Sequence, residues 1–226
     1  MVLPLYFAIF SDEFSKFQKN PHPIAAMGCT FGEEEMVWRD PFPAEMLVVD
    51  DRALPQRVSG HYAQSLLRLL GENRIERVVF DFERPYHPLC AQFLQEICAL
   101  NETKIIVPPT YAESVPSALV LVSGAPCNCW AQFCAAQQEK YPDRWCLEVV
   151  PWRYRVCDGK RHPCSEDVSG RFQHKNTDAL CITGQAGKDF YFFDTGRTLR
   201  EKLGVAGEYS CCLAIGIGAE LLPLTT

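Results

Sequence analysis

Short apolar runs rich in β-branched residues alternate along the chain with segments whose apolar residues recur at helical spacing. The runs that predict strands cover residues 3–10, 24–31, 44–51, 77–83, 103–111, 117–124, 144–154 and 210–218. The helical patterns cover residues 62–73, 87–100, 128–141 and 198–209. Because most of the strands are apolar on both faces and helices stand between them, the pattern predicts a mainly parallel sheet covered by helices.

The number of predicted core strands, about eight, is that of a closed (β/α)8 barrel. We therefore predict an α/β fold, a compact TIM barrel that forms a single domain over residues 1–226, with an open doubly wound sheet as the alternative. No GxGxxG motif follows the first strand, which disfavours dinucleotide binding, and no cofactor is expected. Residues 179–185 and 188–195 are predicted to pair as a hairpin, and the polar stretch 159–176 is predicted to be a loop.

The composition of the chain indicates which classes of binding partner are disfavoured. The 226 residues carry a formal net charge of −6 without a basic run, which disfavours nucleic acids and anionic membranes as partners. The chain begins without the pattern of a signal peptide and contains no apolar stretch of about 20 residues, so a cytoplasmic location is predicted. The 12 cysteines are expected to be mostly reduced core residues. Their clusters lack paired CxxC spacing, so no metal site is predicted.

The stretch RVVFDFERP, residues 77–85, places two carboxylates one residue apart at the end of an apolar run. Side chains alternate along a strand, so Asp81 and Glu83 are expected on one face. Two acids there repel each other, which costs free energy unless the pair has a chemical task or a cationic partner. We interpret the pair as functional, and an ion pair of Glu83 with Arg153 or Arg155 is the structural alternative.

Other polar and aromatic residues follow the remaining predicted strands. Three acids are interpreted as caps of the helices that follow them: Asp12, Asp50 and Asp51. Four aromatic residues are candidate stacking surfaces for a substrate: Tyr86, Tyr111, Trp152 and Tyr154. A barrel mouth lined by carboxylates and aromatic rings is typical of a sugar-binding site, because acids bond hydroxyl groups and rings stack on pyranoses.

Three stretches resemble one known family. IERVVFDFE, residues 75–83, resembles the fourth-strand signature of the family 18 glycoside hydrolases, usually written DxxDxDxE. LEVVPWRY, residues 147–154, is similar to the family's seventh strand with its Pro-aromatic pair, and residues 189–221 resemble the segment through its last strand. The resemblance implies a chitinase-like barrel of the spore-associated branch. It would act on glycans that contain N-acetylglucosamine, such as chitin or peptidoglycan in the cell wall.

The resemblance also implies a mechanism, substrate-assisted hydrolysis. Glu83 would donate a proton to the glycosidic oxygen, and the N-acetyl group of the substrate would attack the anomeric carbon. Asp81 would orient that acetamide and stabilise the ion that forms. Glu83 must then be protonated near neutral pH, which partial burial beside a charged Asp81 is expected to favour.

The chain departs from the family pattern at several supporting positions. Val79 stands where the family has its middle Asp, and Ser123 and Gly124 stand where its sixth strand carries the Tyr and Asp that hold the acetamide. The Trp of the family's last strand is missing. Tyr111 or Tyr154 are candidates to reach in from neighbouring strands. Two functions therefore stay open: a divergent glycosidase, or a barrel that binds a carbohydrate or another partner without turnover.

Overall fold

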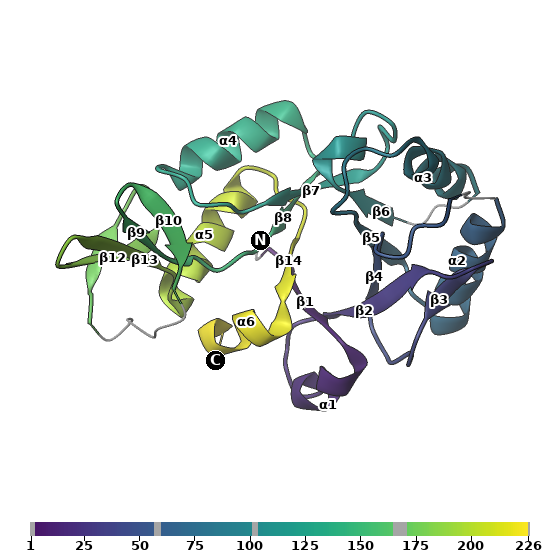
Figure 1. Ribbon diagram of the computed structural model, residues 1–226, viewed down its shortest axis with the longest axis horizontal. Helices are drawn as coiled ribbons and strands as arrows, with labels where there is room; N and C mark the ends of the chain where they lie inside the picture. The colour runs from purple at the N-terminus through teal and green to yellow at the C-terminus, as the bar shows by residue number, and fades with distance from the viewer. Residues whose placement is uncertain (1–2, 57–59, 101–103, 165–170, 226) are drawn as a thin grey trace.

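Eight parallel strands form a closed barrel (Figure 1) in a computed structural model that describes residues 3–56, 60–100, 104–164 and 171–225. The strands are β1 (Leu5–Ile9), β2 (Ile24–Phe31), β4 (Met46–Asp50), β5 (Arg77–Asp81), β6 (Lys104–Val107), β7 (Leu119–Ser123), β8 (Trp145–Glu148) and β14 (Ala214–Ile217). Their order is β1-β14-β8-β7-β6-β5-β4-β2, and parallel pairing of β1 with β2 closes the barrel. The predicted TIM barrel is confirmed, and the open sheet is wrong.

Helices follow several of the barrel strands along the chain. They are α1 (Phe14–Phe17), α2 (Gly60–Asn73), α3 (Pro88–Leu100), α4 (Trp130–Lys140), α5 (Gly196–Glu208) and α6 (Gly218–Thr225), with the 3-10 turns η1 (Ser11–Glu13) and η2 (Pro109–Tyr111). In Figure 1, α2 and α3 lie on one side of the barrel and α4 and α5 on the other. The four predicted helices are confirmed with shifted ends. The sequence did not predict α1, α6 or the short antiparallel β3 (Met36–Trp38), because elements this short show little periodicity.

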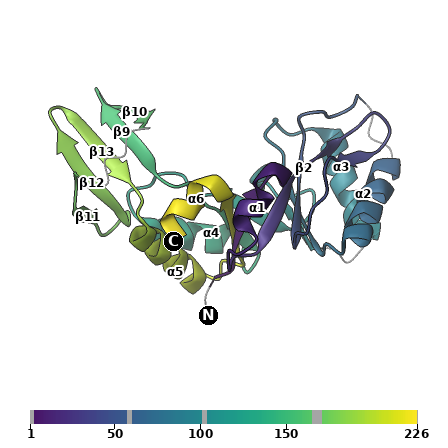
Figure 2. The same ribbon diagram turned by 90° about the horizontal axis from the view of Figure 1, so that it is seen from below.

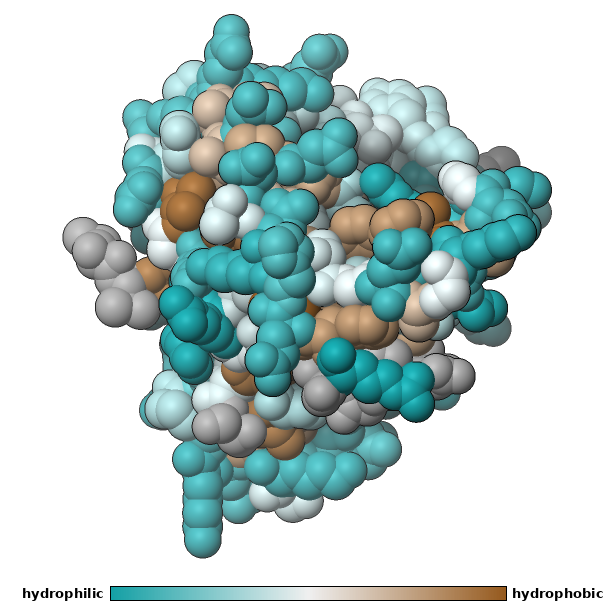
Figure 3. Space-filling model, turned by 90° about the vertical axis from the view of Figure 1, so that its left-hand side faces the viewer, coloured by the Kyte–Doolittle hydropathy of each residue, from teal (hydrophilic) through white to brown (hydrophobic). Residues whose placement is uncertain are grey.

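A second sheet is inserted between β8 and α5. It is antiparallel and contains β9 (Arg153–Cys157), β10 (Lys160–Pro163), β11 (His174–Asn176), β12 (Cys181–Ala186) and β13 (Asp189–Phe193), in the order β10-β9-β13-β12-β11. Figures 1 and 2 show it projecting from the barrel on the side away from α2 and α3. The face of the molecule on this side is mostly hydrophilic, with apolar side chains between the polar ones (Figure 3).

The insertion confirms one prediction and corrects two. Strands β12 and β13 pair as the predicted hairpin. The strand predicted over residues 144–154 is instead two strands in different sheets, separated around Pro151, which has no amide hydrogen to donate to a ladder. The stretch predicted as a loop contains β10 and β11, and its residues 165–170 lie outside the described residues.

Strand alternation decides which side chains enter the barrel. On β5, Val78 and Phe80 pack outward in the apolar core under α2 and α3, whereas Val79 packs with the residues that fill the barrel interior. The side chain of Asp81, two residues beyond Val79, therefore points into the carboxyl end of the barrel. Seven of the twelve cysteines are buried, which agrees with the predicted core role.

Candidate functional site

A small hollow opens at the carboxyl end of the barrel, with Asp81 in its wall. Its cavity volume is about 70 Å³. Three carboxylates line it, and they come from β5, β8 and α6: Asp81, Glu148 and Glu220. The remaining lining residues are aliphatic side chains, a methionine and a glycine, and none of the lining residues is aromatic. The mouth is therefore acidic as predicted, but its walls are aliphatic.

Asp81 holds its proton more tightly than an ordinary aspartic acid. Burial, followed by the nearby charges of Glu148 and Glu83, raises the pKa of Asp81 to about 6, although Arg52 opposes the shift. Roughly half of the Asp81 carboxyl groups are therefore protonated near pH 6. Sequence reasoning missed Glu148, because the strand predicted there continued to residue 154. In the structure Glu148 is the last residue of β8, as Asp81 is the last residue of β5.

Glu83 lies two residues beyond the end of β5 and is exposed. The backbone amides of Glu83 and Arg84 donate hydrogen bonds to the two carboxylate oxygens of Asp51, at 3.3 and 3.1 Å. Asp51 is 2% exposed, so a buried carboxylate fixes the backbone that carries Glu83. The expected partial burial of Glu83 is wrong, because the chain has left the strand at this point.

The three acids interpreted as helix caps have other roles. Helix α2 begins at Gly60, too far along the chain for Asp50 or Asp51 to cap it. Asp50 instead accepts hydrogen bonds from the Thr30 hydroxyl at 2.9 Å and the Arg52 amide at 3.0 Å. Asp12 lies inside η1, where Glu13 accepts the hydrogen bond from the backbone at the start of the turn. The cap interpretation is therefore wrong at all three positions.

The structural alternative for Glu83 is also wrong. Arg155 forms its ion pair with Asp189, with 3.4 Å between nitrogen and oxygen, and Arg153 is exposed on β9 in the inserted sheet. Within the described parts of the chain, no ion pair involves Glu83. Its carboxylate is therefore left facing solvent beside the barrel mouth.

The predicted aromatic residues do not line the mouth. Tyr111 is fully buried, and its hydroxyl accepts a hydrogen bond from the His87 amide at 3.0 Å, while burial raises its pKa. Trp152 is 3% exposed, and Tyr154 lies on β9 in the inserted sheet. Neither Tyr111 nor Tyr154 reaches into the hollow. Of the four candidates, Tyr86 offers a half-exposed ring, which stacks on Tyr111 at 5.4 Å between centroids.

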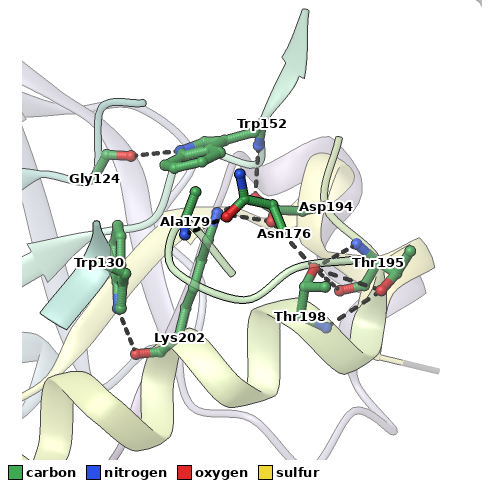
Figure 4. Close-up of polar contacts among 9 residues, drawn as sticks. All are labelled: Gly124, Trp130, Trp152, Asn176, Ala179, Asp194, Thr195, Thr198 and Lys202. Carbon is green, nitrogen blue, oxygen red and sulfur yellow. Dashed lines mark hydrogen bonds and ion pairs between the residues drawn. The ribbon is translucent and has the colours of Figure 1, made fainter. Parts of the chain in front are cut away.

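Trp152 is instead the centre of a buried polar cluster (Figure 4). Its indole nitrogen donates a hydrogen bond to the Gly124 carbonyl at 2.9 Å, and its backbone amide donates one to Asp194 at 2.8 Å. The ammonium of Lys202 lies 3.3 Å from a ring centroid of Trp152 and 2.7 Å from the Asp194 carboxylate. This cluster joins the end of β7, the inserted sheet and α5. The acid and the lysine stand eight residues apart, and no spacing rule marked them as buried.

The fold can be compared with solved structures. A family 18 N-acetylglucosaminidase from Paenibacillus barengoltzii aligns with a TM-score of 0.67 and 8% identity over 95% of this chain and 94% of that one. The fold is that of the chitinase-like barrels. Human YKL-39, described as a pseudo-chitinase with retained chitooligosaccharide binding, aligns with a TM-score of 0.65, 6% identity, and 95% and 92% coverage. The Bacillus megaterium spore cortex-lytic enzyme SleL aligns with a TM-score of 0.60 and 10% identity over 95% of this chain and 70% of that one.

Sequence comparison adds nothing to this chitinase-like fold, because no family model and no curated protein matches the chain. Identities of 10% or less with the solved structures carry the fold and no more. In the described part of the chain, no helix has the length and apolar character needed to cross a membrane. Across the same residues, no three acid, histidine or cysteine side chains are grouped so that they could hold a metal ion.

Proposed function

We propose that this chitinase-like barrel binds glycans that contain N-acetylglucosamine at the hollow around Asp81, and that it turns them over slowly or not at all. One observation carries the proposal. The shielded carboxyl group is Asp81, which lies inside the barrel and whose pKa burial raises to about 6, while Glu83 lies outside and faces water. Substrate-assisted hydrolysis needs the opposite arrangement, because the outer acid must be shielded enough to hold the proton that it donates.

The chemistry of the hollow suits an N-acetyl group. Aliphatic walls contributed by Val48, Val79 and Ile215 can contact the acetyl methyl group. The Asp81 carboxyl can accept a hydrogen bond from the amide N–H or, when protonated, donate one to the carbonyl. The three carboxylates of the mouth favour a neutral sugar over an acidic one, because like charges repel. Human YKL-39 offers a precedent in this fold for chitooligosaccharide binding by a pseudo-chitinase.

The missing partners argue against fast turnover. Val79 leaves no second carboxylate inside β5, and Ser123 at the end of β7 is exposed. Gly124, which follows Ser123, has no side chain to hold an acetamide. Rate enhancement depends on polar groups that are already oriented toward the charge that develops, and losing them costs orders of magnitude in rate.

Binding of chitotriose at pH 7, measured by calorimetry or by NMR titration, tests the proposal. We expect Asp81→Ala to weaken binding at least about tenfold, the loss typical of a hydrogen bond to a charged group. Glu139→Ala is the control, because Glu139 is exposed on α4 and alanine favours helix. Absence of binding by the unchanged protein, or equal binding by both variants, would contradict the proposal.

Hydrolysis remains a second candidate because the chain retains both Asp81 and Glu83 at the end of β5. Fluorogenic chitobiose and chitotriose distinguish the two functions. Turnover that disappears in Glu83→Gln would establish a glycosidase with Glu83 as the acid. Binding without turnover, in both the unchanged protein and Glu83→Gln, is the result that our proposal expects.

A further inference from the structure

A second hollow lies between the inserted sheet and the segment that joins β7 to α4. Its cavity volume is about 270 Å³, compared with about 70 Å³ for the hollow at the barrel mouth. The inserted sheet supplies Tyr154, Arg161 and Phe192 to its wall, and the segment after β7 supplies Cys127 and Asn128. A volume of this size approaches the lower end of the range for ligand pockets, about 300 Å³. The hollow can therefore hold one small molecule.

Aromatic rings form one wall of this second hollow. Tyr154 on β9 and Phe192 on β13 are directly paired across the sheet, and their rings stack at 4.9 Å with an angle of 9° between planes. The ring of Trp152 follows at 6.4 Å from that of Tyr154. Hydrogen bonds and the contact with Lys202 hold Trp152 in place, as Figure 4 shows, so this part of the wall is formed before any ligand arrives.

Among the described residues that line the second hollow, the one charged side chain is the cation Arg161. The guanidinium carbon of Arg161 lies 5.5 Å from the Tyr154 ring centroid, and no ion pair involves Arg161 among the residues that the structure describes. The buried acid Asp194, whose charge acts on Tyr154, is already paired with Lys202. Burial raises the pKa of both Cys127 and Tyr154, so the thiol and the phenol are neutral at pH 7, and no described residue of the lining offsets the charge of Arg161.

Amide groups complete the set of polar contacts. Asn128 and Asn176 both line the hollow. The side-chain oxygen of Asn176 accepts hydrogen bonds from the amides of Asp178 and Ala179, at 3.1 and 2.9 Å, which orients the side chain. Its NH2 group remains a donor, and Asn128 can both donate and accept. The hydroxyl groups of a sugar ring can form hydrogen bonds with these two amide side chains.

We propose that this second hollow binds a sugar acid, with the sugar ring against the Tyr154–Phe192 wall and the carboxylate on the Arg161 guanidinium. A planar guanidinium pairs with a carboxylate through two parallel hydrogen bonds, and aromatic walls pack against pyranose rings. The two hollows thereby differ in charge. The acidic mouth disfavours a carboxylate, whereas the second hollow requires one.

Matched sugars test the proposal on the full chain labelled with 15N. D-glucuronate and D-glucose share the ring and differ in the carboxylate, so each is titrated at low salt while the amide signals of residues 152–156 are followed. We expect glucuronate to shift these signals and to bind at least about tenfold more tightly than glucose, because the ion pair is lost with glucose. Equal binding of the two sugars, or no shift with glucuronate, would overturn the proposal.

Variants separate the role of Arg161 from a general effect of charge. We expect Arg161→Gln to weaken glucuronate binding at least about tenfold while its unperturbed amide spectrum shows that the sheet is intact. Arg153→Gln is the control, because Arg153 is exposed on β9 one residue from Tyr154 and therefore on the opposite face of the sheet. An equal loss in both variants would mean that net charge alone attracts the ligand, and the site would be rejected. The outcome does not depend on whether the barrel mouth binds N-acetylglucosamine.

Discussion

Replacing Lys202 by methionine tests the buried cluster that joins the inserted sheet to the barrel. The side chains of Lys202 and Asp194 are 4% and 2% exposed, and their ion pair is 2.7 Å long. Methionine is flexible and close to lysine in length, so the change removes the charge and leaves little empty volume. The Asp194 carboxylate then keeps the Trp152 amide at 2.8 Å and the Thr198 hydroxyl at 3.2 Å as donors, but no cation.

The expected cost of Lys202→Met is large. Breaking a buried ion pair by removing one partner typically costs about 3–5 kcal/mol, because the remaining charge is buried without compensation. Loss of the ammonium from the Trp152 ring, 3.3 Å away, acts in the same direction. Since domains are stable by about 5–15 kcal/mol, this single change should remove a large share of the free energy of unfolding.

Urea unfolding at pH 7 and 25 °C, followed by circular dichroism, measures the effect. Arg197→Met is the matched control, because it also removes a cation from α5. The ion pair of Arg197 with Glu201 is largely exposed, so this variant should lose less than about 1 kcal/mol of stability. Adding Asp194→Asn to Lys202→Met should recover part of the loss, since the buried charge is then gone. Equal costs for Lys202→Met and Arg197→Met would refute the reasoning.

Three further predictions concern the barrel mouth. Because the pKa of Asp81 is raised to about 6, the folded protein binds more protons than the unfolded chain between about pH 4 and 6, so stability falls as the pH rises through this window. Asp81→Asn should abolish this fall in the free energy of unfolding, measured by urea unfolding at several pH values. At pH 7 the variant should be more stable by about 1 kcal/mol, after allowance for solvent screening. An unchanged pH profile would contradict the burial of Asp81. Asp51→Asn should lower the free energy of unfolding by about 1–3 kcal/mol in the same assay, because it weakens the acceptor of two backbone hydrogen bonds. It should also shift the NMR signal of the Glu83 amide. An unmoved signal would argue that Asp51 does not position Glu83. Gly216→Ala would place a Cβ 2.6 Å from the Val149 carbonyl oxygen and should lower stability by about 1–3 kcal/mol. Gly71→Ala is the contrasting variant: its Cβ would meet nothing within 4 Å, so it should stabilise α2 by up to about 1 kcal/mol. Thermal unfolding of the two variants checks the contrast.

Much of the barrel could be predicted because its signals are local. The apolar run of β5 and the helical spacing of α2 and α3 are properties of neighbouring residues, and each indicates its element without knowledge of the rest of the chain. The position of Asp81 at a strand end was likewise readable, because parallel strands deliver their carboxyl ends to the same side of a barrel. One part of the inserted sheet, the β12–β13 hairpin, could be predicted because its two strands are adjacent in sequence.

The chain by itself thus determined the fold class and the presence of an acid pair beside the mouth. The tertiary structure alone decided which acid of the pair is buried, which partners hold it and where the aromatic residues go. Asp51 meets the amide of Glu83 across 32 positions, and Trp130 donates its indole hydrogen to the carbonyl of Lys202 across 72. The physical reason is that burial and hydrogen bonding depend on which distant segments meet. Periodicity reports one segment at a time, whereas the protonation of Asp81 depends on β8 and on the chain beyond β5 together.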